Sequence, residues 1–298
     1  IDGRCNTREF TTALKFVAHP ISLLSQSHIH SVNMAFSSKK LILASSLFTL
    51  ALADPWPKRG LAANDDIPIS QFGGSYNGHG SQVNWQYNWD STTSQKQSWA
   101  EFVPMLWGTQ SYHTTQWFDN AWYWINNGGS GHLLAFNEPE LGSQANLSPG
   151  DAANAWRQYM EPFYGHAQLG APAVSNDGYN WISQFLQACS DCHIDFIPIH
   201  WYNDWTLEAD FENWVNSICS LGGGRQVWIT EFQAGGNADQ EATFLQSAIP
   251  FLDNNPCVYR YSYFGTADNG KDLLQNGGPS LSSLGIQYAF SPYGSGSV

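Results

Sequence analysis

The chain has 298 residues, a formal charge of −13 and an aromatic content of 15%, including 14 tryptophans that all follow residue 53. Its negative field would repel nucleic acid and anionic membrane surfaces, which excludes both as expected partners. Charged residues make up only 12% of the chain, so we expect most tryptophan rings in the core and the excess along an apolar-faced cleft.

The segment that follows the first methionine is typical of a secretory signal peptide. Met34–Lys40 is basic, Leu41–Leu52 is apolar, and the run ends in an Ala-x-Ala cleavage pattern at Ala53. The apolar run is far shorter than the roughly 20 residues of a membrane-spanning helix, so we expect cleavage after Ala53 and secretion. We interpret residues 1–33 as upstream translation outside the native protein. The alternative is a genuine extension with an internal start.

The remaining chain, residues 54–298, has the length of one (β/α)8 barrel domain, which is roughly 250 residues. Seven Lys and Arg face 23 Asp and Glu in it, a formal charge of −16, which favours a neutral substrate. We find no internal repeat and no composition shift that would mark a second domain. Ser291–Val298 has no hydrophobic tail, so we expect no lipid anchor. We also expect a monomer. Lys58-Arg59 also fits a dibasic processing site.

Eight segments have strand character, because they are apolar runs or alternate apolar with polar residues. We predict a first short strand after Lys58–Ala63, and further strands near 83–89, 101–107, 132–138, 169–175, 194–202, 227–232 and 258–264. Helical spacing predicts helices at 117–127, 148–164, 181–188, 208–219, 240–249 and 280–287. Residues 71–80 are rich in Gly, Ser and Asn and are predicted to form a loop. A helix after most strands predicts a single (β/α)8 TIM barrel of the α/β class.

Four cysteines follow the signal peptide: Cys189, Cys192, Cys219 and Cys257. An even number in a secreted chain favours disulfides, and four cysteines allow three pairings. We expect the bonds Cys189–Cys192 and Cys219–Cys257. The first pair also has the spacing of half a zinc site, but the sequence has no second C-x-x-C, so we expect no metal.

Two predicted strands end in a single glutamate. Glu138 follows an apolar run that begins at Leu133, and Glu231 follows one that begins at Val227. In a barrel these are the fourth and seventh strands, whose carboxyl ends lie across the mouth where active sites are built. Two carboxylates there indicate a glycoside hydrolase, retaining at about 5–5.5 Å separation and inverting at about 6.5–9.5 Å. The alternative is two ordinary surface glutamates.

Alternation of side chains along a strand predicts which residues share a face with each glutamate. The expected sets are Leu134, Phe136 and Glu138 on one strand, and Val227, Ile229 and Glu231 on the other. In this arrangement the apolar members of each set fill the barrel interior below a carboxylate.

The segment Phe136–Glu140, with the sequence Phe-Asn-Glu-Pro-Glu, is followed by Asn-Leu-Ser-Pro at 146–149. It resembles the Asn-Glu-Pro signature of the clan A retaining glycosidases. More narrowly, the chain resembles glycoside hydrolase family 128, the fungal and bacterial endo-β-1,3-glucanases. Further matches to that family occur in order at Lys58–Leu61, Tyr87–Trp89, Phe102–Trp107, Ala171–Val174, His200–Tyr202 and Trp228–Phe232. The resemblance covers nearly all of residues 54–298 and departs at Glu140, where aspartate is expected.

The resemblance implies that Glu138 is the acid/base and Glu231 the nucleophile. Glu138 must then be protonated when the leaving sugar departs, and Glu231 must be ionised to attack the anomeric carbon. Glu138 afterwards acts as the base on water. The resemblance also implies that Asn137 hydrogen-bonds the sugar 2-hydroxyl, the alternative being a turn residue before Pro139.

Further residues are expected to contact the sugar. The resemblance places three consecutive residues in the substrate cleft: His200, Trp201 and Tyr202. Predicted strand ends supply more candidates for stacking on glucose or bonding to it: Trp107, Tyr87, Asn88, Trp89 and Phe264. Core packing is the alternative for each ring, and a satisfied structural histidine is the alternative for His200.

These inferences predict a secreted retaining endo-β-1,3-glucanase that cleaves β-glucan polysaccharide or oligosaccharide by double displacement, without a cofactor. One alternative is the same machinery acting on β-1,4- or β-1,6-glucan. The other is a cell-wall protein that binds β-glucan on the same fold without turning it over.

Overall fold

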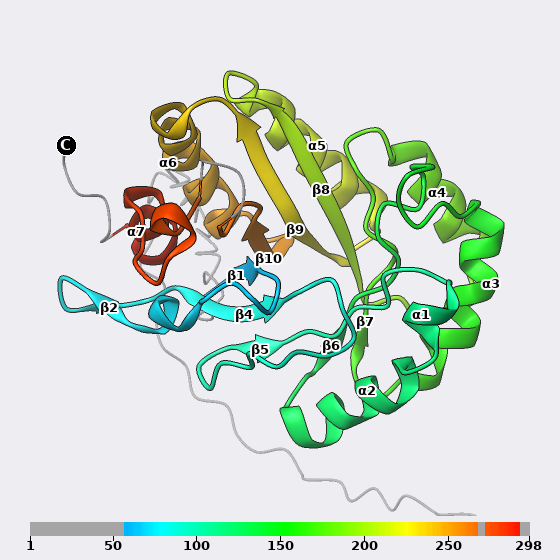
Figure 1. Cartoon of the computed structure of the whole chain (residues 1–298). Coiled ribbons are helices and arrows are strands. Elements are labelled where there is room, and N and C mark those ends of the chain that lie inside the picture. Colours follow the sequence, from blue (N-terminus) through cyan, green and yellow to red (C-terminus); the bar gives the residue numbers. More distant parts are fainter. Residues whose placement is uncertain (1–56, 268–271, 293–298) are drawn as a thin grey trace, which may run out of the picture. The chain divides into compact units, whose positions relative to one another are not determined.

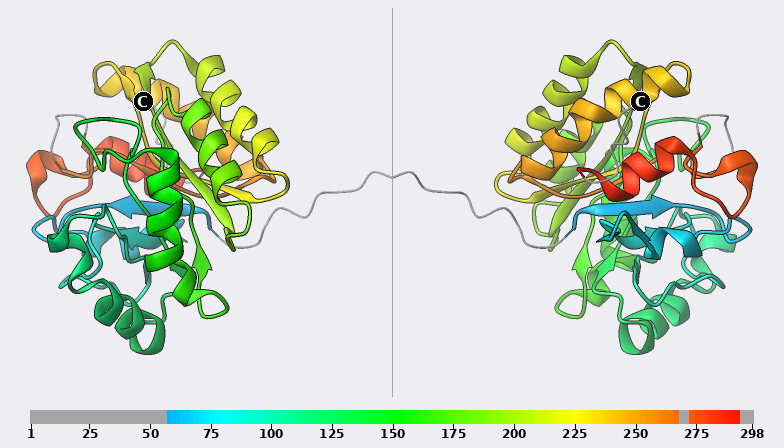
Figure 2. Two further views of the ribbon diagram at one scale, coloured as in Figure 1. Left: turned by 90° about the vertical axis from the view of Figure 1, so that its right-hand side faces the viewer. Right: turned by 90° about the vertical axis from the view of Figure 1, so that its left-hand side faces the viewer.

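The computed structural model describes residues 57–267 and 272–292. The upstream segment, the expected signal peptide and its cleavage site lie outside these residues. Within the described part the chain alternates strands with helices, and the helices lie on the outer side of the strands (Figure 1; Figure 2). No helix in this part is long and apolar enough to span a membrane.

Eight parallel strands position the site. They are β1 (Arg59–Ala62), β4 (Val83–Tyr87), β5 (Glu101–Phe102), β6 (His132–Leu133), β7 (Gln168–Leu169), β8 (Phe196–Asp204), β9 (Gln226–Gly235) and β10 (Val258–Tyr263). One sheet has the order β5-β4-β1-β10-β9-β8, and β6 pairs with β7 in a second sheet. Single parallel bridges, Met105 with Leu134 and Gly170 with Phe196, continue the pairing from β5 to β6 and from β7 to β8. Seven predicted strands therefore have counterparts, and the first strand lies at Arg59–Ala62 instead of after Ala63.

Seven α-helices and four shorter helical turns connect the strands in the described part. The α-helices are α1 (Ser111–Thr114), α2 (Trp117–Tyr123), α3 (Pro149–Tyr159), α4 (Tyr179–Ala188), α5 (Glu208–Leu221), α6 (Ala238–Asn254) and α7 (Ser283–Phe290). The turns are η1 (Ser70–Gly73), η2 (Trp124–Gly128), η3 (Glu161–Phe163) and η4 (Gln275–Gly277). Helix α3 begins as its sequence predicts, because the Asp151 amide donates to Ser148 Oγ (3.1 Å) and proline occupies the first turn.

The region predicted as a loop contains short regular elements. After η1, the strands β2 (Ser75–Tyr76) and β3 (His79–Gly80) pair antiparallel. Asn77 and Gly78 connect them with φ angles of 50° and 82°. Asparagine and glycine tolerate positive φ, which a tight hairpin turn requires. The loop prediction for residues 71–80 is therefore right only in part.

Two disulfides join the predicted partners. Cys189 and Cys192 are bonded with Cα atoms 5.1 Å apart, which removes them as zinc ligands. Cys219 of α5 is bonded to Cys257 just before β10, with Cα atoms 6.0 Å apart. The second bond links elements 38 positions apart in the sequence and so restricts the unfolded chain most.

The Lys58-Arg59 pair is buried at the start of β1. Arg59 is 2% exposed, and its guanidinium donates to Asp253 Oδ2 (2.6 Å) and to the Tyr288 carbonyl (2.7 Å). The Asp253 carboxylate compensates the buried charge. A protease that needs this pair exposed would have to unfold the strand first, so the folded protein offers no dibasic site here.

Two clusters of buried side chains separate the two faces of the strands. One contains only residues on or next to strands: Ala62, Trp85, Tyr87, Val103, Met105, Leu134, Phe196 and Trp228. The other includes Phe136, Val227 and Ile229 together with residues of the helices. Leu134 belongs to the first cluster and faces inwards as predicted. The predicted faces are wrong for Phe136, Val227 and Ile229, which pack outwards against the helices.

A β-bulge in β9 explains how Glu231 still reaches the inner side. Ile229 pairs with Ile199 of β8, whereas Glu231 pairs with the next residue, His200, so Thr230 is an extra residue. One extra residue shifts the alternation of side chains by one position. The strand before Glu138 is interrupted as well, since the pairing beyond Leu134 resumes only at Asn137.

An ion-pair cluster joins β5, β6 and β10 at the amino ends of β5 and β6. Glu101 accepts from Arg260 Nη2 (2.6 Å) and lies 2.8 Å from His132 Nδ1. The Arg260 guanidinium also lies over the Trp228 ring, 4.8 Å from its centroid. Burial alone would raise the pKa of Glu101, but the His132 hydrogen bond and the Arg260 charge outweigh it and lower the pKa to about 2.

Glu101→Gln is expected to lower the free energy of unfolding by about 3 kcal/mol at pH 7. A carboxyl with a lowered folded pKa stabilises the protein above its unfolded value, near 4.5, and loses that contribution as the pH falls toward 2. Urea unfolding at pH 7 and at pH 3 measures both effects, with Glu212→Gln on α5 as the control outside this cluster. An unchanged difference between parent and variant at the two pH values would contradict the assignment.

Candidate active site

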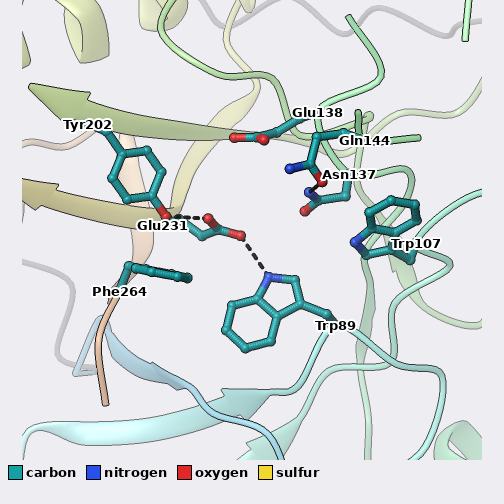
Figure 3. A pocket seen from close by; sticks show the side chains of 8 residues that line it. All are labelled: Trp89, Trp107, Asn137, Glu138, Gln144, Tyr202, Glu231 and Phe264. Carbon is teal, nitrogen blue, oxygen red and sulfur yellow. Dashed lines mark hydrogen bonds between the residues drawn. The ribbon is translucent and has the colours of Figure 1, made fainter. Parts of the chain in front are cut away.

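A pocket of about 340 Å³ lies at the carboxyl ends of the strands (Figure 3). Its lining residues are Trp89, Trp107, Asn137, Glu138, Gln144, Tyr202, Glu231 and Phe264. Seven of these were candidates from the sequence, and Gln144 was not. Aromatic walls around a few convergent polar groups are typical of a small-molecule or sugar site.

Glu138 enters the pocket from a turn that follows the β6 segment. Its amide donates to the Ala173 carbonyl (2.7 Å), and its own carbonyl accepts from the Leu141 amide (3.0 Å). Its φ of +39° lies in the left-handed region, which residues with a Cβ rarely adopt. Such strain is found at functional sites when the surrounding structure holds it in place.

Glu231 is surrounded by hydrogen-bond donors. Trp89 Nε1 donates to Oε1 (2.7 Å), and the Tyr202 hydroxyl makes a short bond to Oε2 (Figure 3). The Tyr87 hydroxyl lies 3.4 Å from Oε1. Burial, followed by the Glu231 charge, raises the pKa of Tyr202 far above its usual range, so its hydroxyl stays a donor. These three contacts fix the orientation of the Glu231 side chain at the pocket wall.

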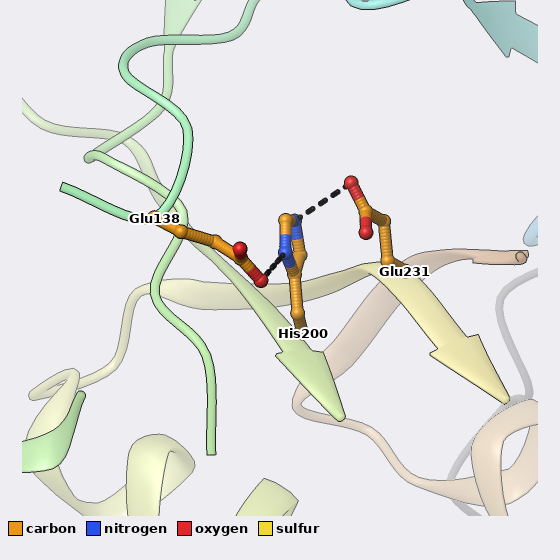
Figure 4. A group of neighbouring side chains, drawn as sticks. All are labelled: Glu138, His200 and Glu231. Carbon is orange, nitrogen blue, oxygen red and sulfur yellow. Dashed lines mark hydrogen bonds and ion pairs between the residues drawn. The ribbon is translucent and has the colours of Figure 1, made fainter. Parts of the chain in front are cut away.

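His200 lies between the two glutamates and is only 1% exposed (Figure 4). Its Nδ1 is 2.8 Å from Glu138 Oε1, and its Nε2 is 3.5 Å from Glu231 Oε1. One atom of each of the three side chains lies within 4.8 Å of the other two. Burial alone would lower the pKa of His200, but the Glu231 charge and the Glu138 hydrogen bond raise it above its usual range.

The same three side chains have donor types that could hold a metal ion. Each imidazole nitrogen already faces a carboxyl oxygen, so the three side chains also fit together through contacts with one another. Glu140, two residues after Glu138, takes a structural role instead, because its Oε1 accepts from the Ser175 amide (2.6 Å).

Besides His200, three candidates lie outside the pocket lining: Tyr87, Trp201 and Asn88. Tyr87 is buried below Glu231 and donates to the Thr230 carbonyl (3.0 Å). Trp201 faces the helices, where its ring stacks on Phe244 at 5.3 Å, because alternation along β8 turns it away from the side of His200 and Tyr202. The structure thus corrects the placement of Trp201 in the cleft.

Asn88 is likewise not a lining residue, and its placement in the cleft is also corrected. Its Nδ2 donates to Asp65 Oδ1 and to the Thr92 carbonyl, both at 2.9 Å, so it holds the loop that carries Trp89. The Trp89 backbone has a φ of +60°. Asn88 therefore supports the tryptophan that contacts Glu231 and does not face the pocket itself.

Gln144 is the lining residue that sequence reasoning missed. Asn137 Nδ2 donates to Gln144 Oε1 (3.2 Å), and the Ala145 amide donates to the Asn137 carbonyl (3.1 Å). Gln144 lies in an irregular segment after Glu138, so no periodic pattern marks it. Among the described residues Asn137 Oδ1 is buried without a hydrogen-bond partner, which leaves an acceptor at the pocket wall.

Comparison with known proteins gives consistent matches. A family model described as glycosyl hydrolase catalytic core matches residues 60–288. Alkali-sensitive linkage protein 1 of Schizosaccharomyces pombe is 34% identical over 242 residues, which cover 76% of this chain and 42% of that protein. The chain therefore spans less than half the length of this curated relative.

Several solved structures of similar fold are GH128 enzymes. A curdlan-specific exo-β-1,3-glucanase of subgroup III from Blastomyces gilchristii, in complex with glucose, is 37% identical, with a TM-score of 0.68 over 78% of this chain and 97% of that one. A subgroup IV endo-β-1,3-glucanase from Lentinula edodes is 25% identical (TM-score 0.65; 78% and 99% covered). A subgroup I endo-β-1,3-glucanase from Amycolatopsis mediterranei, in complex with laminaritriose, is 26% identical, with a TM-score of 0.65 over 78% of this chain and 98% of that one.

Proposed function

The chain belongs to glycoside hydrolase family 128, with a glycosyl hydrolase catalytic core, and from this premise we propose that it hydrolyses β-1,3-glucan with retention of configuration. The observation that carries the proposal is the pair Glu138 and Glu231, with His200 between them. Carboxylate oxygens within 4.8 Å of each other support the retaining separation of about 5–5.5 Å. The named activities of the solved relatives support the linkage.

The first step joins the sugar to the protein. Glu138 donates its proton to the glycosidic oxygen while Glu231 attacks the anomeric carbon, so the C–O bond to the leaving sugar breaks as an ester to Glu231 forms. The hydrogen bonds from Trp89 and Tyr202 hold the Glu231 carboxyl group in place for attack. In the second step Glu138 takes a proton from water, which displaces Glu231 and restores the enzyme.

His200 serves both steps as a cation between the two carboxyl groups. Before attack it faces the ionised Glu231, and after proton transfer it is 2.8 Å from the newly ionised Glu138. A fixed positive charge in a buried site stabilises negative charge without reorganisation of solvent. Asn137 offers its unpaired Oδ1 to the sugar 2-hydroxyl, a contact that strengthens in the transition state.

The proposal includes the setting of the site. The eight parallel strands and their bridging pairs support a closed (β/α)8 barrel formed by residues 54–298, with the pocket at its carboxyl face. Two disulfides are typical of an oxidising compartment and support secretion after cleavage of the signal peptide.

The mode of attack is a separate part of the proposal. We propose internal cleavage, as in the endo-acting relatives that are 25% and 26% identical. The relative that is 37% identical acts as an exo-enzyme, which makes release of glucose from chain ends the competing outcome. Product size distinguishes the two.

A second candidate is a glucan-binding wall protein with little turnover. It is favoured by the 34% identical relative, whose name describes a linkage and states no hydrolytic activity. A complete pair of carboxylates with donors on Glu231 favours the hydrolase over this candidate.

A timed digest of linear β-1,3-glucan tests the proposal, with β-1,4- and β-1,6-glucans in parallel. We expect oligosaccharides from the β-1,3 substrate alone, and NMR of the first product should show the β-anomer. Glucose as the sole early product would replace internal cleavage by exo action. A folded protein that releases nothing from any glucan would leave the binding protein as the better assignment.

A further inference from the structure

Three aromatic rings lead from the pocket wall to the surface at α1. Trp107, which lines the pocket, stacks on His113 with ring centroids 5.1 Å apart and planes 29° apart. His113 in turn contacts the Tyr112 ring, with centroids 4.3 Å apart. Tyr112 is 74% exposed, the largest value among the exposed large hydrophobic side chains of the described part. The three residues form one continuous surface, here called the α1 ridge.

The backbone holds the α1 ridge in a fixed position. The Trp107 carbonyl accepts from the Asn137 amide (2.9 Å), which ties one end of the ridge to the segment that carries Glu138. The His113 amide donates to the Gln110 carbonyl (2.9 Å) and closes the first turn of α1. Burial lowers the pKa of His113, although the Asp90 charge opposes it, which favours the uncharged ring.

The pocket is too small to hold a polymer. Its volume of about 340 Å³ lies near the lower end of the roughly 300–1,000 Å³ that small-molecule sites span. In Figure 3, Trp107 lies on the opposite side of the carboxylates from Tyr202 and Phe264. A sugar chain that crosses the carboxylates and leaves on the Trp107 side therefore continues toward His113 and Tyr112.

We propose that Tyr112 is an outer binding platform for a glucan chain that leaves the pocket along the α1 ridge. The identity of the ligand rests on the proposed function, whereas the ridge itself rests on geometry. Sugar rings present C–H faces that pack on aromatic rings, and tyrosine offers such a face at small entropic cost. An exposed tyrosine alone is ordinary; Tyr112 differs because ring contacts connect it to the pocket wall.

Polymer binding by Tyr112→Ala tests this role without relying on catalysis. Mobility in gels that contain soluble β-1,3-glucan gives the dissociation constant, which we expect to rise about fivefold. Tyr112→Phe should bind like the parent, because the ring and not the hydroxyl makes the platform. Tyr123→Ala is the matched control, since Tyr123 is 56% exposed on α2 and its ring contacts Trp124, which lies outside the pocket lining.

Hydrolysis separates this proposal from the proposed function. We expect Tyr112→Ala to raise KM for the polymer about fivefold and to leave kcat/KM for laminaritriose unchanged, because a trisaccharide stays near the carboxylates. If the parent cleaves glucan but Tyr112→Ala binds and cleaves polymer as well as Tyr123→Ala does, the platform is wrong and the hydrolase stands. If the parent binds polymer through Tyr112 but cleaves nothing, the hydrolase is wrong and the platform stands. If soluble β-1,3-glucan does not slow the parent protein in the gel, the platform is wrong.

Discussion

Glu231→Gln is expected to lower the rate of β-1,3-glucan hydrolysis by roughly 10⁴-fold or more, because an amide cannot form the glycosyl ester. The amide is nearly isosteric with the carboxylate, and its oxygen can still accept from Trp89 Nε1, so the pocket should keep its form. Initial rates by reducing-end assay measure the loss, and glucan retardation in gels should remain near that of the parent.

Glu140→Gln is the matched control for this change. Glu140 is an acid near Glu138 that binds the Ser175 amide and does not line the pocket. A glutamine oxygen can accept the same hydrogen bond, so activity should stay within about twofold of the parent. Equal losses of activity in Glu140→Gln and Glu231→Gln would point to a general effect of charge removal. Full activity of Glu231→Gln would show that Glu231 is not the nucleophile.

Glu138→Ala is expected to reduce cleavage of natural glucan by about 10²- to 10⁴-fold, which is the range of general acid–base catalysis. Substrates whose leaving group needs no proton, such as a dinitrophenyl β-glycoside of a β-1,3-linked disaccharide, should form the glycosyl-enzyme at a nearly normal rate. Hydrolysis of the glycosyl-enzyme should then be slow, because without Glu138 no base activates the water. Steady-state turnover of this substrate should follow an initial burst.

Azide supplies the decisive readout. A small anion needs no base, so it should restore turnover of Glu138→Ala and displace Glu231 with formation of a β-glycosyl azide. In Glu231→Gly the anion would enter on the other face of the sugar and give the α-azide. Identification of the azide anomer by NMR therefore tests both roles at once. An α-azide from Glu138→Ala, or no effect of azide on either variant, would contradict the assignment.

Much of the architecture follows from local patterns. Apolar runs such as Val227–Ile229 mark buried strands because parallel strands are covered on both faces. The glutamates that end two such runs stand out for the same reason, and the structure brings both to one pocket. Ser148 and Pro149 mark the start of α3 because the orphan amides of a first turn need a side-chain acceptor.

What failed to follow from the sequence depends on long-range pairing. The register of β8 decides whether Trp201 faces the sugar or the helices. Side chains alternate along a strand, so the sequence alone allows either orientation. Gln144 reaches the pocket through an irregular segment with no pattern of its own. The turn at Asn77 and Gly78, in contrast, is marked in the sequence by an Asn-Gly pair, which is typical of a tight hairpin. The prediction of a loop did not use this pair.

The bulge at Thr230 makes the position of Glu231 depend more on the number of residues in β9 than on the side chain at position 230. The Thr230 carbonyl accepts hydrogen bonds from the hydroxyl groups of Tyr87 and Ser262, and Tyr87 in turn faces Glu231. This acceptor belongs to the backbone, so a substitution at position 230 retains it while a one-residue deletion removes it together with the bulge. We therefore expect a residue of similar size at position 230 to be tolerated better than any change in the number of residues between Ile229 and Glu231.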